Sequence, residues 1–132
     1  MSVFSQRRVV ITGLGAISNL GHDVASTWSG MLEGRAGIGP ITAFPQDELW
    51  PSRIAGEVHD WDPTEKLDRG EMKKTDRFAQ LGIWAAVEAM ENCGLDWDQG
   101  DPYRRGVVIG SGVGGIQTIE HFSHVLAAKG PK

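Results

Sequence analysis

The stretch RRVVITGLGAISNLG, residues 7–21, and its counterpart RRGVVIGSGVGG, residues 104–115, decide the fold of this chain. Each starts with two arginines, continues with a short β-branched run and ends in a glycine-rich turn. A β-branched run without polar alternation is typical of a strand that is buried on both faces of a parallel sheet. We therefore predict strands over residues 9–12 and 106–110, each leading directly into a glycine turn.

Glycine after a strand has two physical interpretations: a backbone cradle for phosphate, or a close approach of one backbone to another. The second turn reads G-x-G-x-x-G at Gly110, Gly112 and Gly115. A dinucleotide site also needs an acidic residue about 20 positions further on, at the end of a next strand. The sequence stops before such a strand, and Ser18 stands where the first turn would need its third glycine. We favour close backbone packing and keep a nucleotide-binding domain as an alternative.

Hydrophobic periodicity predicts three helices, over residues 23–33, 75–92 and 116–128. The first has one apolar face, with Asp23 at its start and Gly34 as its C-terminal stop. The second is apolar nearly all round and is therefore expected to be buried. The third has one apolar face, formed by Ile116, Ile119, Phe122 and Leu126.

Residues 35–70 show no clear periodicity and hold four of the six prolines, although residues 53–58 (RIAGEV) are compatible with a short hairpin strand. Two buried strands do not make a stable sheet, because three or more are normally needed. The sequence thus has more apolar faces than it can cover. We predict an α/β fold that is one part of a larger structure or docks on a large partner.

Bulk composition narrows the class of protein further. The 132 residues suit one domain, and the formal net charge of −4 argues against nucleic acid as the main partner. A single cysteine excludes an intrachain disulfide and favours a reducing compartment. The sequence shows neither a secretory signal nor an apolar stretch long enough to cross a bilayer. We expect a cytoplasmic protein with no role at membranes.

Three polar features of the sequence are candidate sites. Cys93 ends the predicted long helix, where the helix dipole disfavours a thiolate, so it is interpreted as a packing residue. His121 and His124 lie three residues apart, but no third ligand is evident, and a solvated helix face is favoured over a metal site.

The third feature is the only basic cluster, formed by Arg69, Lys73, Lys74 and Arg77. Cations at the start of the predicted helix 75–92 would oppose its dipole, which suggests a use such as docking an acidic partner. A merely solvated run of charges explains the cluster equally well.

Three ordered stretches together resemble the β-ketoacyl-acyl-carrier-protein synthases, a family of the thiolase-like superfamily. They are residues 7–21 with the following GRAGIGPITAFP, residues 73–95 (KKTDRFAQLGIWAAVEAMENCGL), and residues 104–115, followed by AAKGPK. The similarity covers essentially the whole sequence. It is strongest to the elongating, type II synthases of bacterial fatty-acid synthesis.

The resemblance implies that residues 1–132 are the N-terminal part of a thiolase-like fold with α-β-α-β-α layers, incomplete as given. It implies a homodimer that condenses a cysteine-bound acyl chain with malonyl-acyl-carrier protein, without a metal or organic cofactor. The family's nucleophilic cysteine is expected after residue 132 and its histidines further on. No residue of this sequence is therefore expected to be catalytic, and the 132 residues alone are expected to be inactive.

The resemblance also assigns roles to single residues. Val113 corresponds to a residue that lines the pocket for the growing acyl chain. The family's carrier-docking positions correspond to Arg69, Lys73, Lys74 and Lys132, whereas Gly70 stands at a further position that is basic in the family. Three alternatives stay open besides fatty-acid elongation: a polyketide ketosynthase or chain-length-factor subunit, a non-catalytic interaction fragment, and the nucleotide-binding domain.

Overall fold

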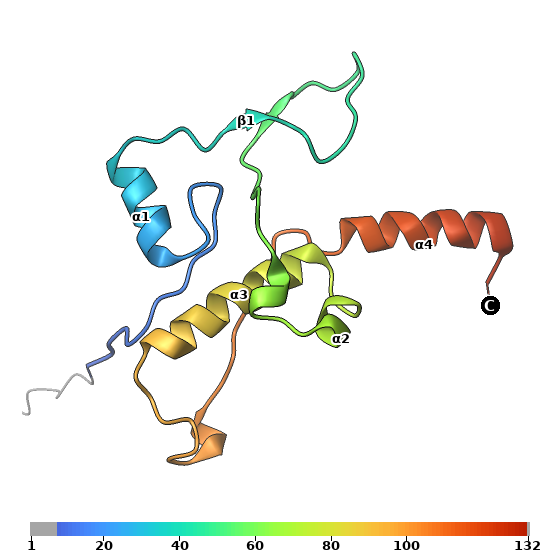
Figure 1. Cartoon of the computed structure of the whole chain (residues 1–132). Helices are drawn as coiled ribbons and strands as arrows, with labels where there is room; N and C mark the ends of the chain where they lie inside the picture. The colour runs from blue at the N-terminus through green and yellow to red at the C-terminus, as the bar shows by residue number, and fades with distance from the viewer. Residues whose placement is uncertain (1–7, 132) are drawn as a thin grey trace, which may run out of the picture.

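The computed structural model describes residues 8–131, in which α3 forms the centre of the arrangement (Figure 1). The pair of strands and α1 lie to one side of α3, and α4 extends away from the rest of the chain. The elements in chain order are α1 Val24–Leu32, β1 Gly39–Pro40, β2 Ile54–Ala55, η1 Pro63–Glu65, α2 Arg69–Met72, α3 Arg77–Asn92, η2 Pro102–Arg104 and α4 Ile116–Lys129.

All three predicted helices are confirmed, with ends that agree to within two residues. Asp23 caps α1 by accepting a hydrogen bond from the Ser26 amide, and the Ser26 hydroxyl completes a capping box. These hydrogen bonds from Ser26 lower the pKa of the Asp23 carboxyl below its ordinary value. Gly34 and Gly94 both have φ of 65° and follow the C-caps of α1 and α3, which is the conformation that stops a helix.

The small apolar core consists of Trp61, Leu67 and Trp84. The two indole rings meet edge to face, with centroids 5.6 Å apart. Lys66 lies over the Trp84 ring and Arg77 over the Trp61 ring, at 5.1 Å and 5.0 Å from the centroids. This cluster fastens the irregular segment before α2 to the middle of α3.

The first glycine turn lies directly on the backbone of α3. A Cβ atom on Gly13 would collide with the carbonyl oxygen of Ala89, and one on Gly15 with that of Ala85. The close-packing interpretation is therefore confirmed for this turn. In the second turn nothing lies within 4 Å of a Cβ on Gly110 or Gly112. That part of the turn has no close backbone neighbour among residues 8–131.

A buried carboxylate, which the sequence did not single out, holds the first turn and α1 on α3. Glu88 is only 8% exposed. It accepts a hydrogen bond from the Ala16 amide at 2.8 Å and another from the Val24 amide at 2.9 Å. Val24 is the first residue of α1, and its amide therefore has no acceptor within the helix. Glu88 supplies the acceptor for this donor.

The two predicted strands are wrong for this structure. Residues 9–12 and 106–110 form no strand, and Val9 and Val108 are 93% and 99% exposed. A strand exists only where a neighbour pairs with its backbone, and neither segment has such a neighbour within the described residues. The sheet of the described range is an antiparallel pair in which Gly39 faces Ala55 and Pro40 faces Ile54. The expected hairpin strand over residues 53–58 is thus confirmed at β2.

Apolar surface is covered only in part. Within α3, Trp84 and Glu88 are buried while Phe78 and Met90 are about half exposed, so the prediction of a helix buried all round is wrong here. The chain exposes 11321 Å², whereas a compact monomer of its mass would expose about 6800 Å². The expected excess of apolar faces is therefore present. No helix within residues 8–131 has the length and apolar content needed to cross a membrane.

Replacing Gly15 by Ala is expected to lower the free energy of unfolding by about 2 kcal/mol, because the added methyl group meets a backbone carbonyl that cannot move aside. Gly82→Ala is the matched control, since a Cβ there meets nothing within 4 Å and alanine favours a helix. Urea unfolding of both variants measures the difference. Equal effects at the two positions would contradict the close packing of the turn.

Glu88→Gln is expected to cost about 1–3 kcal/mol of unfolding free energy, because an amide offers one acceptor oxygen where two amide donors need one each. Glu91→Gln on the same helix changes only an exposed pair with Lys66 and should cost less than about 1 kcal/mol. Denaturant titration compares the two. A Glu88→Gln variant as stable as Glu91→Gln would show that this carboxylate is dispensable.

Candidate functional site

Val113, the residue expected to line an acyl pocket, lies in the second glycine turn immediately before α4. Its side chain is 72% exposed. It borders a pocket of about 180 Å³ between the start of α3 and the start of α4. The lining residues are Asp76, Arg77, Phe78, Val113, Gly115, Ile116 and Gln117.

Two contacts place this turn against α3. Thr118 in the first turn of α4 donates a hydrogen bond from its hydroxyl to Asp76 Oδ1 at 2.5 Å. Gly114 lies against the Phe78 ring, which would be 2.6 Å from a Cβ at that position. Gly115 then starts α4 with a φ of 67°, a conformation that glycine adopts without strain. Nothing in the sequence marks Asp76 and Thr118 as partners, because an Asp before a helix normally signals only a cap for that helix.

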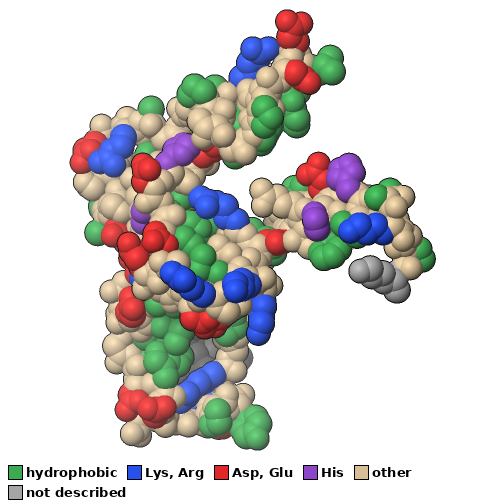
Figure 2. All heavy atoms as spheres, turned by 45° about the vertical axis from the view of Figure 1, so that its right-hand side comes forward, with side chains coloured by type: hydrophobic (Ala, Val, Ile, Leu, Met, Phe, Trp, Pro, Cys, Tyr) green, Lys and Arg blue, Asp and Glu red, His purple; other side chains and the backbone are tan. Residues whose placement is uncertain are grey.

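The basic residues expected to dock a carrier protein lie on α2 and just after it. Arg69 is the first residue of α2, Lys73 is its C-cap, and Lys74 follows; all three are exposed. None of them lies within 4.0 Å of an acidic group of the described range. Figure 2 shows Lys and Arg side chains close together in the middle of the view, where α2 lies. Lys132 lies outside the described residues.

One premise about this cluster is wrong. The lysines were expected at the N-terminus of the long helix, where they would oppose its dipole, but α3 begins only at Arg77. Lys73 instead ends the separate helix α2, and cations are favourable at a helix C-terminus. For the lysines, the helix dipole therefore supplies no reason to assign a use, and the role of the cluster stays a prediction from the resemblance.

The structure brings the basic cluster and Val113 to the same end of α3. Lys74 precedes Asp76 by two residues, and Asp76 lines the Val113 pocket. The basic cluster and the pocket are therefore neighbours along the segment that joins α2 to α3. Sequence spacing alone could not show this proximity, because Val113 is 37 residues after Asp76 and reaches it only through the fold.

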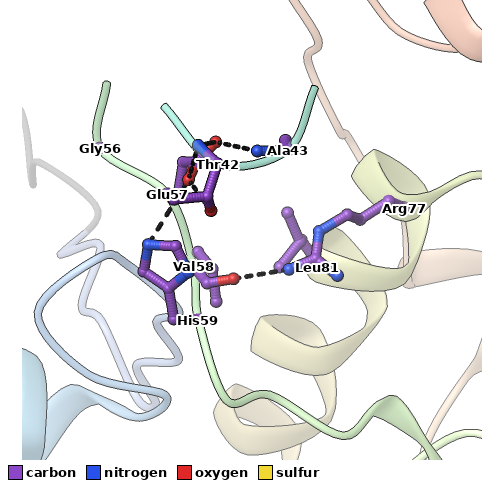
Figure 3. Close-up of a pocket in the computed structure, with 8 residues that line it drawn as sticks. All are labelled: Thr42, Ala43, Gly56, Glu57, Val58, His59, Arg77 and Leu81. Carbon is purple, nitrogen blue, oxygen red and sulfur yellow. Dashed lines mark hydrogen bonds and ion pairs between the residues drawn. The ribbon is translucent and has the colours of Figure 1, made fainter. Parts of the chain in front are cut away.

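A larger hollow of about 500 Å³ lies between the irregular segment and α3 (Figure 3). In it, Glu57 accepts hydrogen bonds from the hydroxyl and amide of Thr42 and from the amide of Ala43, at 2.7, 2.9 and 3.0 Å. These bonds lower the pKa of the Glu57 carboxyl, those from Thr42 most strongly. His59 Nε2 lies 3.5 Å from the same carboxylate.

The polar groups of this hollow hold the chain together rather than face a ligand. Arg77 donates to the Val58 carbonyl oxygen at 2.7 Å while its guanidinium covers Trp61. Glu57 similarly uses its oxygens to join the two arms of the irregular segment. We therefore interpret the hollow as a structural junction, and the Val113 pocket stays the candidate site.

The remaining polar candidates, Cys93, His121 and His124, make only local contacts within the described residues. Cys93 is partly buried, and its Sγ lies 3.1 Å from the Met90 carbonyl oxygen. His121 and His124 lie on exposed parts of α4, where His124 is 4.0 Å from Glu120. In the part of the chain that the structure describes, no three His, Cys, Asp or Glu side chains are grouped so that they could hold a metal ion.

Known proteins that resemble the chain do so over nearly its full length. The 3-oxoacyl-(acyl-carrier-protein) synthase 2 of Coxiella burnetii is 43% identical over 127 residues, which are 96% of this chain and 30% of that protein. The proteins of the same name from Synechocystis sp. and Vibrio harveyi are 40% and 41% identical, over 99% and 97% of this chain and 31% of each relative. The chain thus spans about a third of the length of these relatives.

The match to a family model agrees with these relatives and with the three stretches on which the resemblance rests. Residues 6–130 match the model of the beta-ketoacyl synthase N-terminal domain. That range includes the glycine turn on α3, the basic cluster on α2 and the turn that carries Val113. The chain therefore belongs to the beta-ketoacyl synthase family.

Proposed function

We propose that this chain is part of an enzyme that elongates fatty-acyl chains by decarboxylative condensation. The observation that carries the proposal is the similarity, over nearly the whole chain, to relatives named 3-oxoacyl-(acyl-carrier-protein) synthase 2. Those names favour fatty-acid elongation over a polyketide ketosynthase, a chain-length factor or a non-catalytic fragment. The first glycine turn also faces α3 backbone, which argues against a phosphate cradle there.

The proposed reaction forms one carbon–carbon bond. An acyl chain is held as a thioester on a cysteine that this chain does not supply. Malonyl-acyl-carrier protein loses CO₂, and the electron pair left on its methylene carbon attacks the thioester carbonyl. The cysteine thiolate leaves, and the product is a 3-oxoacyl chain on the carrier protein. Because the departing CO₂ releases the electron pair, the chemistry needs no metal or organic cofactor.

In this proposal the described residues supply binding surfaces rather than catalytic groups. Val113 forms part of the wall that limits the length of the bound acyl chain. Arg69, Lys73 and Lys74 have no acidic partner among residues 8–131 and present positive charge to an acidic carrier protein. A screened attraction of this kind steers association. Their location beside the Val113 pocket would bring a docked carrier protein close to the acyl-binding end of α3.

We further propose that residues 9–12 and 106–110 are strands of a layered α-β-α-β-α sheet in the whole enzyme. Their β-branched composition and the exposure of their large apolar side chains, from 63% at Val10 to 99% at Val108, support this proposal, since such residues are usually buried between sheet neighbours. A homodimer and a cytoplasmic location stay predictions.

Condensation by the native protein that contains this sequence tests the proposed function. Incubated with an acyl-carrier protein charged with acyl and malonyl groups, it should release CO₂ and form a 3-oxoacyl product, detected by mass spectrometry. The positive control is a synthase of established activity in the same mixture. If that control forms product and the native protein forms none, the proposal is wrong.

Reversing two charges, Lys73→Glu with Lys74→Glu, should raise KM for the carrier-bound substrate on the order of tenfold at low salt, because attraction becomes repulsion. The effect should shrink as salt is raised, since the screening length falls to about 8 Å at physiological ionic strength. The matched control is Arg53→Glu, an exposed cation next to β2 and outside the positions assigned to carrier docking. Steady-state kinetics with carrier-bound and carrier-free thioesters measure both. An equal change in the control would leave the cluster as a merely solvated face.

A further inference from the structure

We propose that Asp76 and Thr118 form a brace that fixes the second glycine turn, and that this brace sets how long an acyl chain the Val113 pocket accepts. Both are positioning residues, because they act through Val113 and not on the substrate. The inference rests on the proposed function for its substrate. Its structural half, the brace itself, stands on the contacts of the described residues.

The brace joins the starts of two helices that are far apart in sequence. Thr118 donates its hydroxyl hydrogen to Asp76 Oδ1 at 2.5 Å, across 42 residues of sequence. A hydroxyl that donates to a carboxylate gives a short bond, roughly twice as strong as one between neutral groups. The other carboxylate oxygen faces the turn, since it would be 2.9 Å from a Cβ on Gly115, the N-cap of α4.

Asp76 differs from the other aspartates that precede helices in this structure. Asp23, Asp62, Asp68 and Asp101 each accept a backbone hydrogen bond from the helix that they precede. Asp76 is the N-cap residue of α3 and yet makes no side-chain hydrogen bond to that helix. Its carboxylate instead reaches across to α4, where it lies near the N-terminal ends of both helices. Each end carries partial positive charge, so the carboxylate stabilises the junction of the two.

The turn is held at its end and free at its beginning. Gly114 lies against the Phe78 ring, and Gly115 lies against Asp76. Nothing lies within 4 Å of a Cβ on Gly110 or Gly112 in the described structure. Val113 stands between the free half and the held half and borders the pocket together with Phe78. The brace therefore controls how far Val113 can move away from α3.

Thr118→Val keeps the shape of the side chain and removes its donor. In the native protein, this variant should accept longer acyl chains because Val113 gives way. The ratio of kcat/KM for long primers to kcat/KM for short primers should rise by about threefold to tenfold, the factor that one hydrogen bond is worth. Thr118→Ser restores the hydroxyl and should restore the ratio. Ser123→Ala, an exposed hydroxyl on the same helix, is the matched control and should leave the ratio unchanged.

Amide hydrogen exchange over residues 113–117 tests the brace without catalysis. Exchange should become faster in Thr118→Val and stay as in the wild type in Thr118→Ser and Ser123→Ala. Unchanged exchange overturns the brace, and faster exchange with an unchanged primer ratio overturns its role in chain length. A wild-type protein without condensation activity refutes the proposed function, while the exchange data still decide the brace. If Thr118→Val does not fold, Asp76→Asn takes its place, because it keeps a hydrogen-bond acceptor but loses the charge. It should speed amide exchange over residues 113–117 and raise the long-to-short ratio of kcat/KM, both to a smaller extent.

Discussion

The buried carboxylate of Glu88 is the contact on which the arrangement of the N-terminal third depends. It joins α3 to the amide of Ala16 at the end of the first glycine turn and to the amide of Val24 at the start of α1. Two partly buried donors that would otherwise lack partners are thus satisfied by one side chain. The same contact holds Gly13 and Gly15 on the backbone of Ala85 and Ala89, where only glycine fits. The Glu88 carboxylate and the lack of side chains at Gly13 and Gly15 therefore together hold the first glycine turn on α3.

Sequence reasoning predicted the features whose causes are local. The helices were predictable because Asp23, Gly34 and Gly94 mark their ends through contacts within a few residues. Glu88 was not, because its partners are backbone amides 64 and 72 residues away, and backbone amides carry no sequence signal. The prediction of strands over residues 9–12 and 106–110 was wrong for a related reason. A β-branched run expresses a preference for a sheet, but a strand forms only where another segment pairs with it.

The candidate site likewise combines features that the sequence predicted with features that only the fold reveals. The roles of Val113 and of the lysines came from resemblance to a family, and the residues themselves gave no physical reason for them. Their proximity follows from the break between α2 and α3, which the periodicity of residues 75–92 did not reveal. Because of this break, Lys73 ends α2 instead of preceding one long helix. Its positive charge is therefore favoured by the dipole of α2, whereas the predicted helix would have opposed it. Asp76 lies at this break, and it links the cluster to the pocket.

The large uncovered surface has a consequence for biosynthesis. Relatives of this chain are roughly three times as long, and residues 6–130 match the model of an N-terminal domain, so in a protein of that length such a segment would leave the ribosome early. At about 5–20 residues per second, its exposed apolar side chains would wait tens of seconds for the later segments. Ile119, Phe122 and Val108 are then open to any apolar surface nearby. In a protein of that length, such a segment would be a natural client for chaperones that bind during translation.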